Sequence, residues 1–182
     1  ILDISVSLPA ADPEPSCPIW SSYFGDTDDD RPSEMVTLSN GDVLVCGYTF
    51  SPMFPATLGA YDEIFNGTQD AYWSKFNDQY AHDYTTFYDG SGADVGNSIA
   101  VSADEQSVYL FGKTNSTDIG TFAYSGSSFM DDDPEANNCF VARFSLVSFP
   151  PGAQEWRTYF GADVFGCNCI RTDDADNVFL AG

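Results

Sequence analysis

Hydrophobic residues along this chain gather in short, nearly continuous runs that are separated by turn-forming residues. Two of the clearest runs are "DVLVCGYT" (42–49) and "SVYLFGKT" (107–114), and such runs are typical of β-strands that are covered on both faces. The sequences "SNGD" (39–42) and "DADN" (174–177) are suited to tight hairpin turns. No segment shows the periodicity of an amphipathic helix, so the pattern predicts an all-β protein.

Three segments of the chain resemble one another, which indicates a repeated structural unit. They begin at Trp20, Tyr84 and Trp156, 64 and 72 residues apart. A second pair of matching segments, "DAYWSKFN" (70–77) and "NCFVARFS" (138–145), keeps the same order. Each unit predicts four short strands, and the third unit is truncated. The predicted strands are 34–38, 42–49, 71–76 and 83–88 in the first unit, and 97–102, 107–113, 138–144 and 155–160 in the second.

The first residues, "ILDISVSL", lie outside the repeat and alternate between apolar and polar positions. This is the pattern of a half-buried strand, and a Pro-rich spacer (9–18) separates it from the first repeat. We therefore expect an N-terminal strand and spacer at 1–19 and the repeats at 20–182. We predict that the strand pairs with a sheet edge of a neighbouring subunit and helps the protein to polymerise head to tail. The alternatives are a strand that packs on its own sheet or one that belongs to an upstream domain. The apolar residues of this assembly strand are Leu2, Ile4, Val6 and Leu8.

The first repeat has the segments "YFG", "GDVLVCGYT", "SPMFPATLGAYD" and "DAYWSKFN" in that order. In this it resembles the seven-bladed β-propeller repeat family, often abbreviated SBBP. The resemblance covers about residues 20–182 and is weaker in the second unit, where "NSTDIGTFAYSGSSF" replaces the loop. It implies a partial β-propeller of about two and a half four-stranded blades at the cell surface or outside the cell. The last strand, "NVFLAG", stops where its counterparts continue, so we expect either a piece of a longer chain or completion of the fold by other subunits.

The charge of the chain excludes several classes of partner. Its 28 acidic and 6 basic residues give a net charge of -22, which repels phosphate backbones and anionic lipids. We therefore expect no binding to nucleic acid. No apolar run approaches the length that would span a bilayer, so we expect no membrane insertion. An acidic surface of this kind favours solubility in a salty medium and attracts cations.

The five cysteines are best explained by an extracellular chain in which some of them are bridged, because their spacing does not make a zinc site. We expect Cys139 to pair with Cys167 or Cys169, and Cys17 to pair with Cys46.

Calcium is the one cofactor that the sequence suggests. Asp26, Asp28 and Asp30 alternate in "GDTDDDRPSE" as calcium ligands do, although the EF-hand pattern fails further along the loop. The alternative is a set of turn formers on an acidic surface. Two sequons, at Asn66 and Asn115, are candidate glycosylation sites of a glycoprotein.

No arrangement of residues indicates an enzyme. His82 is the only histidine, no nucleophile elbow is present, and with 28 acids a close carboxylate pair carries no information. Asp94 aligns with Asp30, which favours a repeated structural task over an active site. We therefore expect a non-catalytic extracellular structural protein, a repeat-bearing subunit of a surface adhesin or a self-assembling fibre or filament. The alternative is a glycan-binding propeller module that uses exposed aromatic rings, for which the candidates are Phe50, Tyr61, Trp73 and Tyr124.

Overall fold

Twelve β-strands and no helix make up the part of the chain that the computed structural model describes, which is residues 2–6, 20–119, 138–147, 152–160 and 166–182. The expected all-β fold is therefore confirmed for these residues, and no helix among them could span a membrane. The strands are β1 (Leu2–Val6), β2 (Trp20–Phe24), β3 (Asp30–Thr37), β4 (Val43–Thr49), β5 (Asp70–Phe76), β6 (His82–Tyr88), β7 (Asp94–Val101), β8 (Ser107–Thr114), β9 (Asn138–Ser145), β10 (Gln154–Phe160), β11 (Cys169–Thr172) and β12 (Val178–Ala181).

The strands form four separate antiparallel sheets. Two sheets have four strands, in the orders β3-β4-β5-β6 and β7-β8-β9-β10, and two have only two strands, β1-β2 and β11-β12. All eight strands that the two full repeats predict are present. β3 begins four residues earlier than predicted, and β7 begins three residues earlier. In each strand a bulge interrupts the alternation of inward and outward side chains, so the sequence pattern does not extend to the first residues.

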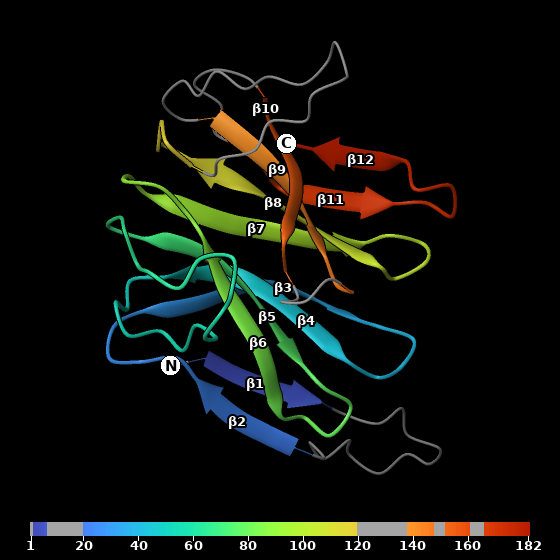
Figure 1. Cartoon of the computed structure of the whole chain (residues 1–182), viewed down its shortest axis with the longest axis horizontal. Helices are drawn as coiled ribbons and strands as arrows, with labels where there is room; N and C mark the ends of the chain where they lie inside the picture. The colour runs from blue at the N-terminus through green and yellow to red at the C-terminus, as the bar shows by residue number, and fades with distance from the viewer. Residues whose placement is uncertain (1, 7–19, 120–137, 148–151, 161–165) are drawn as a thin grey trace.

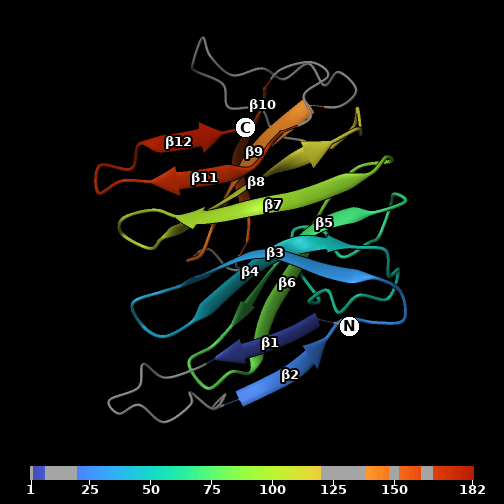
Figure 2. The same cartoon turned by 180° about the vertical axis from the view of Figure 1, so that it is seen from behind.

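The four sheets are stacked one above another, with β1-β2 at one end and β11-β12 at the other, and they do not close into a ring (Figures 1 and 2). Every residue of β4, β5, β8 and β9 but one per strand is buried, as expected for strands that are covered on both faces. The main apolar core lies between the two four-stranded sheets, where the ring centroids of Trp73 and Phe144 are 5.8 Å apart. Two smaller clusters lie between these sheets and the outer pairs.

The same β-bulge occurs in both four-stranded sheets and explains a recurring glycine. The register shifts between Pro32 and Glu34 opposite β4, and between Gly96 and Ser98 opposite β8. Next to these shifts lie Gly47 and Gly112, where a Cβ atom would collide with a backbone carbonyl oxygen of the bulged strand. Only glycine permits this close approach. The fold therefore requires the glycine of "CG" in the first repeat and of "FG" in the second.

The N-terminal strand has a partner within its own chain. β1 pairs antiparallel with β2 over five consecutive residue pairs, from Leu2 opposite Phe24 to Val6 opposite Trp20. The strand therefore has a partner in its own chain, as in the first of the two alternatives, and its pairing with a neighbouring subunit stays a prediction. One edge of β1 is thereby hydrogen-bonded to β2. Leu8, which the prediction included, lies outside the described residues.

A disulfide joins Cys139, the second residue of β9, to Cys167, which precedes β11. This is one of the two pairings expected for Cys139, and it attaches the β11-β12 sheet to the β7-β8-β9-β10 sheet. Cys169 is a free thiol. The expected bridge between Cys17 and Cys46 is wrong, because Cys46 is a free thiol that is fully buried in the core. Cys46 acts there as a small apolar side chain, and burial raises its pKa far above the ordinary value.

Replacing both bridged cysteines (C139S with C167S) should lower the free energy of unfolding. The bridge closes a loop with a sequence separation of 28 residues. The loss of that constraint on the unfolded chain corresponds to about 3 to 4 kcal/mol. The measurement is urea-induced unfolding followed by tryptophan fluorescence. The matched control is C169S, which removes a free thiol next to the same strand and should leave the midpoint unchanged. Equal midpoints for all three proteins would show that the bridge does not stabilise the fold.

Candidate functional site

Asp30 and Asp94 do the same structural work in successive sheets. The Asp30 carboxylate accepts the backbone N–H of Asp26 at 2.8 Å and the hydroxyl of Thr49 at 2.5 Å. The Asp94 carboxylate likewise accepts the backbone N–H of Gly90 at 2.8 Å. In each sheet the loop that precedes the first strand is thus fastened to the first residue of that strand. The interpretation of the two aligned aspartates as a repeated structural feature is confirmed.

A threonine and a serine add further hydrogen bonds to each of these loops. Ser51 donates its backbone N–H to the Thr49 hydroxyl at 2.8 Å, and its own hydroxyl accepts the N–H of Asp28 at 3.0 Å. Ser116 makes the equivalent bonds to Thr114 at 2.9 Å and from Gly92 at 2.8 Å. The polar groups at these strand ends are therefore engaged with the backbone, which leaves them poorly suited to chemistry on a ligand.

The calcium prediction at Asp26, Asp28 and Asp30 gains no support from this geometry. Asp30 is buried, and both of its carboxylate oxygens accept hydrogen bonds from the protein. Nowhere in the described ranges do three His, Cys, Asp or Glu side chains form a group that could hold a metal ion. Calcium at this loop stays a prediction.

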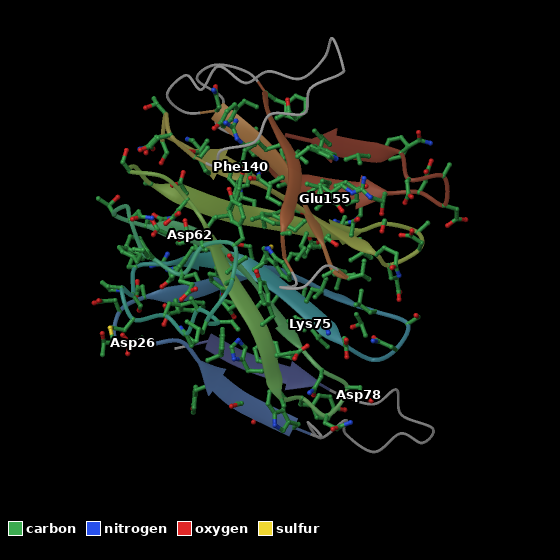
Figure 3. The ribbon with its side chains drawn as sticks, in the orientation of Figure 1. Asp26, Asp62, Lys75, Asp78, Phe140 and Glu155 are labelled. Atoms are coloured by element: carbon green, nitrogen blue, oxygen red, sulfur yellow. A yellow bond between two sulfur atoms is a disulfide. The ribbon has the colours of Figure 1, made fainter. Side chains whose placement is uncertain are left out.

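The other candidate residues lie apart from one another. Lys75 of β5, which is labelled in Figure 3, forms ion pairs with Asp42 and Asp83, each at 2.9 Å. Asn66 and Asn115 are exposed in loops, where they remain candidate glycosylation sites. Of the four aromatic candidates, Trp73 is fully buried, Tyr61 is half-buried, Phe50 is 37% exposed, and Tyr124 lies outside the described residues.

The structure forms a pocket that the sequence analysis did not anticipate. It has a volume of about 430 Å³ and lies where the loops after β4, β6 and β8 meet at one end of the sheets. Figure 3 labels Asp62 at this end. We call it the carboxylate pocket, and its lining residues are Tyr61, Asp62, Asn66, Asp89, Gly90, Ser91 and Asp118.

Asp70 lies fully buried behind the carboxylate pocket and holds the loop before β5. Its two oxygens accept the backbone N–H groups of Asn66 at 2.7 Å and of Gly67 at 3.0 Å. Asp89 follows β6 directly, and one of its oxygens accepts the N–H of Asn66 at 3.3 Å. Its other oxygen, Oδ1, is buried and accepts no N–H or hydroxyl hydrogen bond from the described residues, whereas the Asp89 carboxyl group is hydrogen-bonded to the side chains of Asp70 and Asp62. Two carboxyl groups thus share one backbone donor.

These surroundings keep Asp89 protonated at neutral pH. Burial, followed by the hydrogen bond and the charge of Asp70 and then by Asp62, raises the pKa of Asp89 to about 10. Burial also raises the pKa of Asp70, against the hydrogen bonds from Asp89 and the loop. Because Asp70 is fully buried, this pair cannot present two carboxyl groups to a substrate as a glycosidase does.

No sequence signal could have identified this pocket. Asp62, Asp89 and Asp118 come from three loops of two different repeats, and the loop that carries Asp62 has no close counterpart in the second unit. With 28 acidic residues, their identity alone does not distinguish them from turn formers.

Replacing Asp89 with asparagine should weaken the pH dependence of stability. Between about pH 4 and pH 10 the folded chain keeps a proton on Asp89 that the unfolded chain has lost. The contribution of this proton to the free energy of unfolding is therefore largest below pH 4 and falls as pH rises toward 10. The slope for one proton is about 1.4 kcal/mol per pH unit. The free energy of unfolding in urea, measured from pH 5 to pH 9, should therefore decline less steeply for Asp89→Asn than for the wild type. At pH 8 the variant should be the more stable of the two.

The control for this experiment is Asp174→Asn, which makes the same change of charge at an exposed position. It should keep the slope of the wild type. If the free energy of unfolding of Asp89→Asn declined with pH as steeply as that of Asp174→Asn, a buried proton on Asp89 would be excluded.

Comparison with known proteins adds no family to this description: no protein-family model matches the chain, and no curated protein sequence matches it.

Proposed function

We propose that this chain is a non-catalytic structural protein of the extracellular space or cell surface, which associates head to tail with copies of itself in a fibre or an adhesin. One observation supports this function above all others. The chain carries two halves of a four-stranded sheet at the opposite ends of its stack, and the halves are complementary.

The N-terminal half corresponds to the third and fourth strands of a complete sheet. In the first full sheet Lys75 pairs with Tyr84, and the register runs on to Ala71 opposite Tyr88. β9 and β10 pair in the same way from Arg143 opposite Trp156. β1 and β2 repeat this register over the same five pairs, from Val6 opposite Trp20. The pair β1-β2 is thus built like the outer half of a sheet.

The C-terminal half corresponds to the first and second strands. Thr37 pairs with Val43 in the first full sheet, Val101 pairs with Val108 in the second, and Thr172 pairs with Val178 in β11-β12. The next three pairs follow in the same register in each case. The pair β11-β12 is thus built like the inner half of a sheet, with β12 in the place of β4 and β8.

A complete sheet follows when β12 of one copy pairs with β1 of the next. Both edges are outermost in their two-stranded sheets, and the two halves lie at opposite ends of the stack (Figures 1 and 2). The first four-stranded sheet of the neighbouring copy would also cover Phe179, which is 57% exposed. The counterparts of Phe179 in the full sheets, Leu44 and Tyr109, are 0% and 3% exposed. Such a contact joins unlike surfaces, so it propagates into a filament unless the rotation between copies closes a ring.

The propeller arrangement that the sequence resemblance implies agrees with this proposal. Each copy supplies two full sheets and two halves, and full sheets of four antiparallel strands that stack face to face are the units of a β-propeller. The disulfide between Cys139 and Cys167 favours an oxidising compartment and so supports an extracellular location.

Glycan recognition by an aromatic surface has less support. Trp73 is fully buried between the sheets, and the hydroxyl of Tyr61 is hydrogen-bonded to Gln154 at 2.7 Å. The rings that are described serve mainly to pack one sheet on another, which is the task of a scaffold.

Leu180→Pro should abolish self-association and leave the fold intact. The carbonyl groups of Asn177 and Ala181 face β11, so the alternation of an antiparallel strand turns the N–H of Leu180 toward the open edge of β12. Proline removes that donor without removing a bond to β11. Light scattering after size-exclusion chromatography, with negative-stain micrographs, should show filaments or rings for the wild type and monomers for Leu180→Pro. The control Leu180→Ala keeps the N–H and should still assemble.

A mixing experiment tests the polarity of the contact. A variant that lacks residues 1–8 keeps an intact β12 edge, and Leu180→Pro keeps an intact β1 edge. Each should be monomeric alone, whereas an equal mixture should form a dimer of one copy of each. A wild-type chain that stays monomeric at all concentrations, or a mixture that forms no dimer, would contradict the proposed function.

A further inference from the structure

We infer that the head-to-tail contact closes on itself after two copies, so that the assembly is a ring of six four-stranded sheets. The ring rests on the proposed function, because it is made by the same pairing of β12 with β1. Such a contact allows either an open filament or a closed ring. The choice between them depends on β3, β7 and β11, which are the first strands of three successive sheets and which we call the inner strands.

The three inner strands converge on one side of the molecule. Arg171 of β11 forms an ion pair with Glu34 of β3 at 2.7 Å, although the sheet that begins with β7 lies between their sheets (Figure 2). Sheets that stack in parallel lie about 10 Å apart, so a parallel stack would place β3 and β11 about 20 Å apart. This distance is greater than the two side chains reach together. The sheets are therefore inclined to one another, with the inner strands at the narrow side.

The inner strands also surround a common hollow. It has a volume of about 270 Å³ and is lined by residues 34–36 of β3, 99–101 of β7 and 171–172 of β11. Figure 2 shows the three strands next to one another on the side that faces the viewer. Successive sheets that share one inner hollow are arranged around an axis, as the blades of a propeller are.

A repeated hydrogen bond joins each inner strand to the next one. The carboxylate of Glu34 in β3 accepts the backbone N–H of Ile99 in β7 at 3.0 Å. The hydroxyl of Ser98 in β7 accepts the backbone N–H of Ile170 in β11 at the same distance of 3.0 Å. Glu34 and Ser98 hold equivalent places in the registers of their sheets. One rotation therefore relates each inner strand to its successor.

Met35 marks the place where a second copy would add the missing inner strand. In the register of β3 it holds the place of Ile99 in β7 and of Ile170 in β11. Ile99 and Ile170 are 2% and 0% exposed, because the sheet before each of them packs on it, whereas Met35 is 47% exposed. The sheet before β3 is the half β1-β2, which lacks its first two strands. The pair β11-β12 of a second copy supplies those strands and covers Met35.

The number of sheets in each copy determines the size of the ring. Two full sheets and two halves amount to three sheets, so a closed ring contains a multiple of three. Propellers of four-stranded sheets have about four to eight blades, and six is the only multiple of three in that range. Two copies therefore close the ring, with β12 of each copy paired to β1 of the other. Growth then stops, because no β1 or β12 edge is left open.

The mass of the assembly distinguishes a ring from a filament. Native mass spectrometry and light scattering of the full wild-type chain should show two copies of the 19.8 kDa chain, with no further growth as the concentration rises. Negative-stain micrographs should show discs. Assemblies of more than two copies would overturn the ring and leave the head-to-tail contact intact. A chain that stays monomeric would overturn the ring together with the proposed function.

The strength of the dimer is a second test of closure. A mixture of Leu180→Pro with the variant that lacks residues 1–8 can form only one contact between β12 and β1. In the wild-type dimer a second contact forms within the assembly, which raises the affinity by about 100-fold or more. Sedimentation of dilution series should therefore give a dissociation constant that is lower for the wild type by at least about this factor. Equal dissociation constants would overturn the ring.

Met35→Asp tests which surface the second copy covers. The residue is exposed in the single chain, so the variant should fold, but a carboxylate that the neighbouring β11 buries should weaken the dimer by about tenfold or more. The matched control is Val147→Asp, because Val147 is 64% exposed and lies after β9, and its dissociation constant should stay within about twofold of the wild type. Equal effects of the two variants would overturn the arrangement. The mass of the wild-type assembly tests the ring even if Met35→Asp fails to fold.

Discussion

Each four-stranded sheet of this protein is apolar on both faces, and the rest of the structure depends on this constraint. Along β4, Val43 and Val45 pack toward β1-β2, whereas Leu44 packs toward the next sheet. Because water cannot cover either face without a large loss of free energy, each sheet needs a neighbour on both sides. The stack of sheets in Figure 1 is the result.

The strands were predictable because their causes are local. Continuous apolar runs mark β4, β5, β8 and β9, and the repeat then places the less regular strands beside them. The repeat also marks a shared backbone feature, since Gly47 and Gly112 recur at the position where a bulged backbone approaches closely. The bulges themselves were not visible, and the beginnings of β3 and β7 were misplaced for that reason.

Features that depend on distant contacts were harder to predict. The choice of Cys167 over Cys169 as partner of Cys139, and the burial of Cys46 as a free thiol, are decided by how one sheet lies on the next. The pairing of β1 within its own chain remained only an alternative, because β2 lies beyond a spacer that carries no pairing signal. The carboxylate pocket could not be predicted for a further reason: an acidic chain offers too many aspartates for residue type to mark a site, and only the fold brings Asp62, Asp89 and Asp118 to one pocket.

Asn66 joins the carboxylate pocket to a candidate glycosylation site. It lines the pocket, its side-chain amide nitrogen donates to the carbonyl oxygen of Ile64 at 3.0 Å, and it is the first residue of a sequon. An oligosaccharide on this nitrogen would stand at the mouth of the pocket and exclude other ligands by its bulk. The same polypeptide would then exist in an open and a closed form, and the secretory machinery of the producing cell, rather than the amino-acid sequence, would determine the proportion of each.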